Sequence, residues 1–311
     1  MDNIICIAGP TASGKTALAV ALAKEVNGEV VSCDSMQIYK RMNIGTAKPT
    51  EEEMEGIPHH MLSVAEPDED FSVSRYCEMA TPIVEDILSR GKNVIIAGGT
   101  GLYMDALIRG NSFAPYPSTG RRQELEQLAE NEGIEAVLCQ LRQIDPESAD
   151  RLHPGDKKRI IRAMEVYLET GITITEHNRR TQEIPDRFSP VWFALEDENR
   201  ADLYNRIDSR VLKMLDMGLI PEIQELLHSG IPEKATSMQA IGYKEFVDAL
   251  QGRCTMQEAT ALVQQASRHY AKRQLTWFRR NSAMHWLRRK PDDTTAEILS
   301  LARQILRDFD N

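Results

Sequence analysis

The stretch IAGPTASGKTALAVALAKEV, residues 7–26, decides the fold of this chain. Four of its residues fill the fixed positions of the pattern G-x-x-x-x-G-K-[ST], which is the signature of a phosphate-binding loop. The apolar run before it (residues 3–9) predicts a buried strand, and the run after it has helical periodicity. Backbone N–H groups of such a loop close on phosphate oxygens at the positive end of the helix. We therefore expect the following residues to bind a phosphate group: Gly9, Pro10, Thr11, Ala12, Ser13, Gly14, Lys15 and Thr16.

Two residues of this loop carry charge or bind metal. Lys15 is expected to neutralise a terminal phosphate, and the hydroxyl of Thr16 is expected to ligate Mg²⁺, the predicted cofactor. Loops of this kind usually hold ATP or GTP, so nucleotide binding is the first interpretation.

Alternating strands and helices follow the loop. GEVVSCDS (residues 28–35) and KNVIIAGGTGLY (92–103) each contain a strand-like apolar run, and residues 74–90 are predicted to be helical. The order predicts an α/β fold, a parallel sheet wound by helices. Because ligands on such sheets bind outside the carboxyl ends of the strands, the phosphate loop, residues 33–37 and residues 98–103 should converge.

A change of character after Gly110 predicts a second domain. Helical segments are expected around 120–132, 134–143 and 156–170, followed by a polar loop over 176–190 and a strand at 191–195 that rejoins the sheet. We expect a nucleotide-kinase-like core made of residues 1–112 and 191–311, with a helical insertion at 113–190.

Charge and composition limit the possible partners. The net charge is −10, yet residues 259–291 contain no Asp or Glu and carry eight Lys and Arg residues. This region is typical of a local polyanion site, or of a solvated helix face. No apolar run is long enough to span a membrane, no secretory signal is visible, and five scattered cysteines favour a reducing cytoplasm. We expect a cytoplasmic monomer.

An ATP-hydrolysing protein of this class needs an acid at the end of an apolar strand. The clearest later strand ends in Gly98 and Gly99 instead, and the one acid at a strand end is Asp34. By position alone, Asp34 is equally a metal ligand, a helix cap or a general base.

Seven motifs resemble those of the tRNA dimethylallyltransferases, in the same order along nearly the whole chain. They are GPTASGKT (9–16), DSMQIYKRMNIGTAKP (34–49), PHHML (58–62), GGTGLY (98–103), DKKRIIRAMEV (156–166), SMQAIGYKE (237–245) and AKRQLTWFR (271–279). The resemblance implies transfer of a dimethylallyl group from dimethylallyl diphosphate to the N6 amine of the tRNA adenosine 3′ of the anticodon. It also explains the missing acid, because diphosphate is then the leaving group and no water is activated.

The resemblance assigns roles to individual residues. Asp34 matches the family's general base, Thr100 a threonine that contacts donor phosphate or RNA, and Arg210 an arginine of diphosphate binding and turnover. Arg206 is a weaker candidate of the same kind, and the family holds a flipped adenine with a motif that corresponds here to residues 34–37. The catalytic residues implied are Asp34, Thr16, Arg210 and Thr100.

The expected tRNA surface joins these residues to two basic helices. Lys158 and Arg162 are spaced i, i+4, so they share a helix face. Trp277 either stacks on a base or packs in the core, and the core is favoured. The residues expected to contact the tRNA anticodon stem-loop are Asp34, Ser35, Met36, Gln37, Thr100, Arg122, Lys158, Arg159, Ile160, Ile161, Arg162, Lys272 and Arg273.

Three alternatives remain open. A P-loop small-molecule kinase and an adenylate isopentenyltransferase acting on free nucleotide are the enzymatic ones, but the second has little use for the basic region at 268–290. An NTP-switched RNA-binding protein is the third, and it would need the acid that is missing here. His59 and His60 are interpreted as structural because no Cys or acidic cluster accompanies them.

Overall fold

The computed structural model describes residues 3–110 and 119–310. The chain divides into two compact units, one formed by residues 1–110 and 187–311 and the other by residues 111–186. The second unit begins and ends within a few residues of the insertion expected at 113–190.

A parallel sheet forms the centre of the first unit. Its strands pair in the order β3-β2-β4-β1-β5-β6, and each neighbouring pair is parallel. The predicted α/β fold is therefore confirmed, including the strand at 191–195 that rejoins the sheet beside β1. The six strands are β1 (Ile4–Ala8), β2 (Gly28–Ser32), β3 (His59–His60), β4 (Asn93–Gly98), β5 (Val191–Asp197) and β6 (Met284–Arg289).

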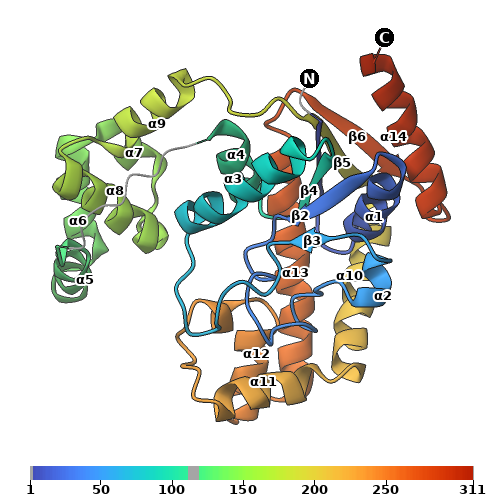
Figure 1. The fold of residues 1–311 in the computed structure, drawn as a ribbon. Helices are drawn as coiled ribbons and strands as arrows, with labels where there is room; N and C mark the ends of the chain where they lie inside the picture. Colours follow the sequence, from blue (N-terminus) through green and yellow to red (C-terminus); the bar gives the residue numbers. More distant parts are fainter. Residues whose placement is uncertain (1–2, 111–118, 311) are drawn as a thin grey trace. The chain divides into compact units, whose positions relative to one another are not determined.

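Helices cover both faces of this sheet. Every residue of β1 and β2 is buried, as expected for parallel strands with two covered faces. On one face α1 (Lys15–Glu25) and α14 (Thr295–Asp310) close the main hydrophobic core, and α3 (Val73–Ser89) and α4 (Gly101–Arg109) lie on the other (Figure 1). The carboxyl ends of β1, β2 and β4 are thus adjacent in space.

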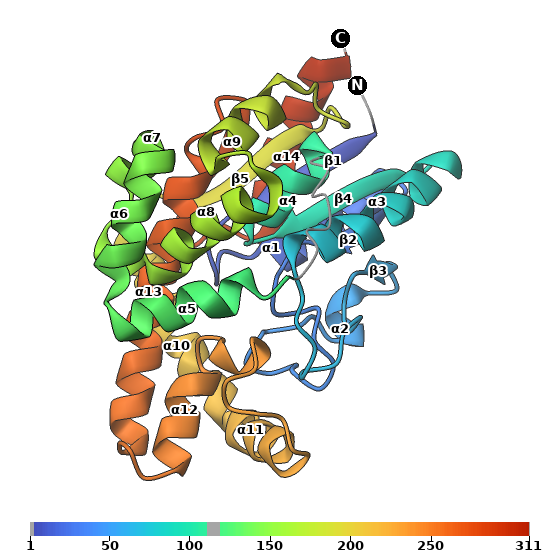
Figure 2. The ribbon, with the colours of Figure 1, turned by 90° about the vertical axis from the view of Figure 1, so that its left-hand side faces the viewer.

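The remaining helices of this unit pack around one long helix. α13 (Met256–Phe278) reaches from the sheet edge to a helical layer made by α10 and α12 (Figure 2). It therefore connects the strand ends to the helices that follow β5. The other elements of the unit are α2 (Glu51–Met54), α10 (Arg200–Asp216), α11 (Leu219–His228), the 3-10 turn Ser237–Gln239 and α12 (Tyr243–Leu250).

The second unit is a bundle with its own hydrophobic core. Leu125, Val137, Leu141, Ile160 and Met164 are among the buried residues that hold its helices together. Its described elements are α5 (Arg121–Asn131), α6 (Ile134–Ile144), α7 (Pro146–Arg151), the 3-10 turn Pro154–Asp156, α8 (Lys157–Thr170) and α9 (Ile174–Glu183).

The prediction of a polar loop over 176–190 is wrong for its first half, where α9 forms. Thr173 caps this helix by accepting a hydrogen bond from the Glu176 N–H at 3.2 Å. Glu176 in the first turn then pairs with Arg179 and Arg180 one turn later. A cap and i, i+3 and i, i+4 ion pairs stabilise a helix that has little apolar surface.

Two short strands were not anticipated. β3 consists of His59–His60, and β6 consists of Met284–Arg289. β6 is half-buried and pairs with β5 over six residues, from Trp192 with Met284 to Asp197 with Arg289. Two of the basic residues expected near the polyanion site therefore lie on a strand.

Within the described residues, no helix combines the length and hydropathy needed to cross a membrane. All five cysteines are free thiols.

Candidate active site

The phosphate loop has an open helix end. Gly14 caps α1 in the left-handed conformation (φ 90°), and as a glycine it has no side chain to accept a hydrogen bond from the first turn of that helix. Ala12 is also left-handed (φ 61°), which turns the backbone between β1 and α1. Helix N–H groups without a capping side chain are a ready anion site. Lys15 Nζ donates to the Pro10 carbonyl at 2.6 Å across this loop.

Arg206 supports the loop from outside. Its Nε donates to the Ala12 carbonyl at 3.1 Å, while Nη2 lies 2.6 Å from both carboxylate oxygens of Asp197. Asp197 is at the end of β5 and its side chain is 4% exposed. The ion pair with Asp197 therefore holds Arg206 against the loop. The guanidinium uses Nε and Nη2 for hydrogen bonds within the protein.

Three charged groups converge beside the loop. Burial lowers the pKa of Lys15 to about 8, with Asp34 raising it and Arg210 lowering it further. The pKa of Arg210 is also lowered by burial and raised by Asp34. Buried cations whose pKa values are shifted by a nearby carboxylate are typical of a functional site. The structure thus brings Lys15, Asp34 and Arg210 together, as the convergence of strand ends predicts.

Asp34 uses one of its oxygens to shape the backbone. Oδ1 accepts hydrogen bonds from the N–H groups of Met36 at 2.8 Å and Gln37 at 3.3 Å. Within residues 3–110 and 119–310, no group donates to its Oδ2. The cap role left open by the sequence is therefore real, and a second oxygen remains for chemistry.

Thr100 joins the ends of β2 and β4. Its Oγ1 accepts from the Ser35 N–H at 3.0 Å, and its own N–H donates to the Cys33 carbonyl at 3.2 Å. Tyr270 of α13 hydrogen-bonds to Thr100, and burial raises the pKa of this phenol to about 12. Thr100 is thus fixed beside Asp34, and Tyr270 is a site residue that the sequence analysis missed.

Gln274 of α13 ties two strand ends together. The Thr11 N–H donates to its Oε1 at 2.9 Å, and its Nε2 donates to the Gly99 carbonyl at 2.9 Å. A Cβ on Gly99 would lie 2.1 Å from Nε2, so this glycine is required for the close approach. Gln274 stands inside the motif AKRQLTWFR, but nothing in its sequence position shows that it reaches a loop 263 residues away.

Trp277 packs in the protein. Its Nε1 donates to Asp105 Oδ2 at 2.9 Å, and a Cβ on Gly101 would lie 2.2 Å from the indole ring. The favoured core interpretation of Trp277 matches this packing.

Gln37 is fully engaged within the protein. Its Oε1 accepts from Ser32 Oγ at 3.0 Å, and its Nε2 donates to the carbonyls of Thr46 at 3.3 Å and Ala47 at 3.0 Å. Base contact by this amide stays a prediction, and it requires exchange of one of these bonds. Ser35 and Met36 lie on the same half-exposed turn after Asp34.

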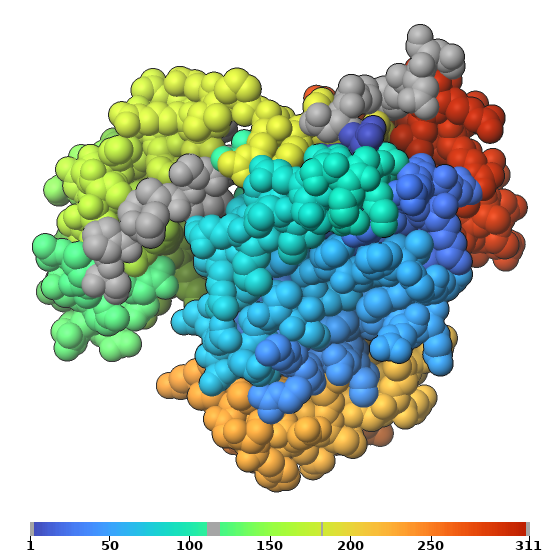
Figure 3. All heavy atoms as spheres, in the orientation of Figure 1, coloured from blue at the N-terminus to red at the C-terminus, as the bar shows by residue number. Residues whose placement is uncertain are grey.

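The segment 34–50 is held against the helical layer. Glu222 of α11 accepts from the N–H groups of Asn43 and Ile44 at 2.8 Å and Gly45 at 3.2 Å, and the Tyr243 hydroxyl donates to the same carboxylate at 2.6 Å. Figure 3 shows residues of this segment, in blue, next to the orange residues of that layer. The segment that begins at Asp34 is therefore anchored at its far end.

The basic surface of α13 is exposed near this site. Lys272 and Arg273 are both exposed, and the Arg273 guanidinium lies 5.7 Å from the centre of the Tyr270 ring. Arg268, in contrast, pairs with Asp208 at 2.5 Å. The positive charge available to a polyanion is thus smaller than the count of basic residues suggests.

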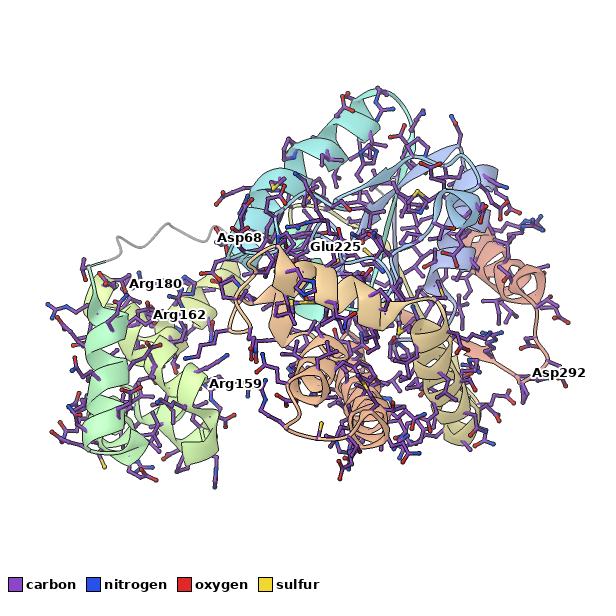
Figure 4. All side chains as sticks on the ribbon, turned by 90° about the horizontal axis from the view of Figure 1, so that it is seen from below. Asp68, Arg159, Arg162, Arg180, Glu225 and Asp292 are labelled. Atoms are coloured by element: carbon purple, nitrogen blue, oxygen red, sulfur yellow. The ribbon has the colours of Figure 1, made fainter. Side chains whose placement is uncertain are left out.

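The second unit contains a basic cavity of about 810 Å³. Arg122 and Arg162 on its wall both pair with Glu165, at 3.1 and 2.8 Å. Lys158 and Arg159 are exposed at its rim, and Figure 4 labels Arg159 and Arg162 on α8 and Arg180 on α9. The lining residues are Arg122, Glu126, Glu130, Ser148, Leu152, Lys157, Lys158, Arg159, Ile161, Arg162, Ala163, Ile174 and Asn178.

Ile160 was expected to contact RNA, but its side chain is buried. It is 0% exposed and packs in the core of the second unit, whereas Lys158 and Arg159 on the same helix are exposed. Ile161 is 3% exposed and forms the floor of the cavity.

These features define a class of protein. A six-stranded parallel sheet wound by helices, with a helical unit inserted between β4 and β5, is the architecture of an α/β protein with two units. The strand that would carry a Walker-B acid, β4, ends in Ala97 and Gly98.

Comparison with known proteins gives the family. The IPP transferase family model matches residues 37–281, so the chain belongs to the IPP transferase family. It is 42% identical over 310 residues to a tRNA dimethylallyltransferase of Acetivibrio thermocellus, covering 99% of each chain. It is also 45% identical to one from Caldanaerobacter subterraneus subsp. tengcongensis, covering 91% of each.

Solved structures give the same result. A tRNA isopentenylpyrophosphate transferase from Bacillus halodurans is 40% identical, with a TM-score of 0.74 over 98% of this chain and 96% of that one. A eukaryotic dimethylallyltransferase acting on tRNA is 28% identical, with a TM-score of 0.81 over 98% of this chain and 79% of that one.

Proposed function

We propose that this chain transfers a dimethylallyl group from dimethylallyl diphosphate to the N6 amine of the tRNA adenosine 3′ of the anticodon. The observation that carries the proposal is the free Oδ2 of Asp34 beside Lys15 and Arg210, in a phosphate site whose neighbouring strand β4 has no acid. Hydrolysis of a phosphate would need a further acid on β4 to position a water molecule, and β4 has none. Asp34 is therefore better suited to take a proton from a bound nucleophile. The full-length relatives named tRNA dimethylallyltransferases support the same reaction.

The proposed reaction forms one bond, breaks one bond and transfers one proton to Asp34. The adenine N6 forms a bond to C1 of the dimethylallyl group, the C1–O bond breaks, and its electron pair leaves with the diphosphate. Asp34 Oδ2 accepts the proton that N6 loses during attack. Lys15 and Arg210 stabilise the charge that develops on the diphosphate, together with the N–H groups at the open end of α1.

Mg²⁺ fits this site as a partner of the diphosphate. The Thr16 hydroxyl is at the start of α1 and forms no hydrogen bond with the described part of the chain, so it is free to act as a ligand. The described residues contain no cluster of three His, Cys, Asp or Glu side chains. The ion would therefore take its other ligands from diphosphate and water, and it would supply charge neutralisation on the leaving group.

We propose that the RNA contacts the turn Asp34–Gln37, Lys272 and Arg273 in the first unit and the cavity wall around Arg122 and Lys158 in the second. Exposed Lys and Arg side chains on both units support this assignment. We also propose that the protein acts as a cytoplasmic monomer. The five free thiols fit a reducing compartment.

Prenyl transfer is tested directly with unmodified tRNA. The purified chain is incubated with dimethylallyl diphosphate, Mg²⁺ and tRNA bearing adenosine next to the anticodon, and nucleosides are analysed by mass spectrometry. We expect the N6-dimethylallyl nucleoside in this tRNA and not in a matched tRNA with guanosine at that position. Prenylation of free AMP but not tRNA would favour the adenylate enzyme, and ATP-dependent phosphorylation without prenyl transfer would favour a kinase.

A further inference from the structure

A small, partly open cavity lies between α1 and the sheet. It measures about 20 Å³ and is lined by Thr16 and Ala19 of α1, by Val30, Ser32 and Ala97 of the sheet, and by Gln37, Pro49 and His59. A space of this size holds one water molecule if it offers two to four polar partners. Thr16, Ser32 and His59 supply such partners.

His59 presents an acceptor to this cavity. Its Nδ1 lies 2.8 Å from the Ile57 carbonyl oxygen, which can only accept a hydrogen bond, so Nδ1 carries the proton. Nε2 is then the unprotonated nitrogen, and this buried atom has no hydrogen-bond partner among residues 3–110 and 119–310. Burial also lowers the pKa of His59, which keeps the ring neutral. A buried acceptor without a partner is costly unless a water satisfies it.

Two other groups around the cavity, the hydroxyls of Ser32 and Thr16, can each form a further hydrogen bond. Ser32 Oγ donates to Gln37 and keeps its lone pairs. The Thr16 hydroxyl forms no hydrogen bond with the described part of the chain. A water that donates to His59 Nε2 and Ser32 and accepts from Thr16 forms three hydrogen bonds, the usual number for a buried water.

We propose that His59 is a positioning residue for the phosphate site, acting through one buried water that accepts the hydrogen of the Thr16 hydroxyl. With this hydrogen directed inward, the lone pairs of Thr16 face the loop mouth, where a divalent cation and the diphosphate bind. This inference rests on the proposed function for the identity of the bound group.

β4 has no acidic side chain that could accept the hydrogen of the Thr16 hydroxyl, so the acceptor must come from another strand. Ala97, at the end of that strand, lines the same cavity and offers only a methyl group. The inward-facing acceptor comes from β3, the edge strand beside β2. Adjacent strand residues face opposite sides, so His60 lies away from the cavity and its Nε2 contacts Glu29 at 2.8 Å.

Two measurements test the proposal without catalysis. Long-range ¹H–¹⁵N spectra of the full chain, assigned with His59→Gln, should show His59 as the neutral Nδ1–H tautomer. Titration calorimetry with inorganic diphosphate should show His59→Leu binding about ten- to a hundred-fold more weakly in Mg²⁺, as for loss of an outer-shell partner. Without Mg²⁺ its affinity should stay within about two-fold of the parent chain. His59→Gln should restore most of the affinity, because its amide oxygen can accept in place of Nε2.

His60→Gln is the matched control, since it alters the neighbouring imidazole on the other face. It should leave Mg²⁺-dependent diphosphate binding unchanged, and thermal unfolding should show that all variants are folded. In a Thr16→Val background, His59→Leu should have no further effect, because the two residues act through one water. An Nε2–H tautomer, equal weakening with and without Mg²⁺, or additive effects of the two substitutions would overturn the proposal.

The outcome is separable from that of the proposed function. If the parent chain prenylates tRNA while His59→Leu binds diphosphate normally, only this inference fails. If the parent chain binds Mg²⁺-diphosphate in a His59-dependent way but never prenylates tRNA, only the proposed function fails.

Discussion

Asp34 divides its carboxylate oxygens between the fold and the open site. Oδ1 accepts from the Met36 and Gln37 N–H groups and fixes the turn, while Oδ2 has no donor among the described residues. An asparagine at this position can keep the first role, because its amide oxygen also accepts two N–H groups. The two roles of Asp34 can therefore be separated by one substitution.

We expect Asp34→Asn to lower the single-turnover rate of prenyl transfer by about 10²–10⁴-fold, the usual contribution of a general base. The dissociation constant for tRNA should change by less than about two-fold, since the turn is retained. Rapid-quench kinetics and filter binding measure the two quantities. Normal turnover at saturating tRNA combined with lost RNA binding would make Asp34 a docking residue instead.

Lys48 gives the segment 34–50 a dependence on pH. Its ammonium donates to the Tyr39 carbonyl at 2.6 Å, Asn43 Oδ1 at 3.0 Å and Ser63 Oγ at 2.8 Å. Burial lowers its pKa to about 8, although Glu222 raises it. Between pH 8 and the ordinary lysine pKa of 10.5, the unfolded chain therefore holds more protons at this residue than the native chain.

By linkage, this proton difference makes the unfolding free energy rise with pH in that window. We expect urea titrations from pH 7.5 to 10 to show a more positive slope for the parent chain than for Lys48→Met. Lys40→Met, which alters an exposed lysine of the same segment, should leave the slope of the parent chain intact. A steeper slope in Lys48→Met would contradict the assignment.

Helix α13 connects the phosphate loop to the end of β4 through Gln274. Its amide matches one donor, the Thr11 N–H, and one acceptor, the Gly99 carbonyl. Gln274 is 5% exposed, so water cannot replace these bonds. The helix thereby fixes the distance between the phosphate loop and the strand end next to Thr100.

We expect Gln274→Leu to lower the unfolding free energy by about 1–3 kcal/mol, because it leaves buried backbone groups without partners. It should also raise the KM for dimethylallyl diphosphate, since Thr11 belongs to the phosphate loop. Gln264→Leu is a suitable control, because Gln264 lies on the same helix and donates to the Asp208 carbonyl at 3.3 Å. Equal effects of the two substitutions would show that α13 contributes only general packing.

The sequence predicts those elements whose signals are local. The glycine pattern of residues 9–16 and the apolar runs of β1, β2, β4 and β5 were sufficient for the fold and for the position of Asp34. β3 has only two residues, and β6 carries Arg288 and Arg289, so neither has a hydrophobic pattern of its own. α9 depends on a cap and ion pairs, which periodicity does not detect.

Site residues that act over long sequence separations were not predictable in the same way. Glu222 reaches Asn43 from 179 residues away, and Gln274 reaches Thr11 from 263 residues away. Their partners are backbone groups, which leave no trace in the residue types of the loop. The side chain of Gln37 bonds to Ser32 and to the carbonyls of Thr46 and Ala47, and its contact with a base stays a prediction.

At the scale of the whole molecule, an acidic protein displays separate basic surfaces. The net charge is −10, and many arginines are neutralised by ion pairs such as Arg268 with Asp208 and Arg122 with Glu165. Lys158 is exposed with no ion pair in the described residues, and Arg159 reaches only Asp156, at 3.6 Å. Long-range electrostatic attraction of RNA therefore depends on a few residues within each unit.

We expect Lys158→Ala and Arg159→Ala each to reduce the slope of log K against log salt for tRNA binding by about one, since each removes one phosphate contact. The rate at saturating tRNA should stay close to that of the parent chain, because the proposed reaction assigns no catalytic role to either residue. Arg121→Ala is the matched control, as Arg121 is exposed in the same unit, pairs with Glu124 at 2.9 Å and does not line the cavity. Ile160→Ala should instead lower the stability of the second unit by about 2–5 kcal/mol, the cost of emptying a core position. If Arg121→Ala changes the salt slope as much as Lys158→Ala does, then RNA is attracted by the overall field of the unit and the cavity wall has no special part in binding.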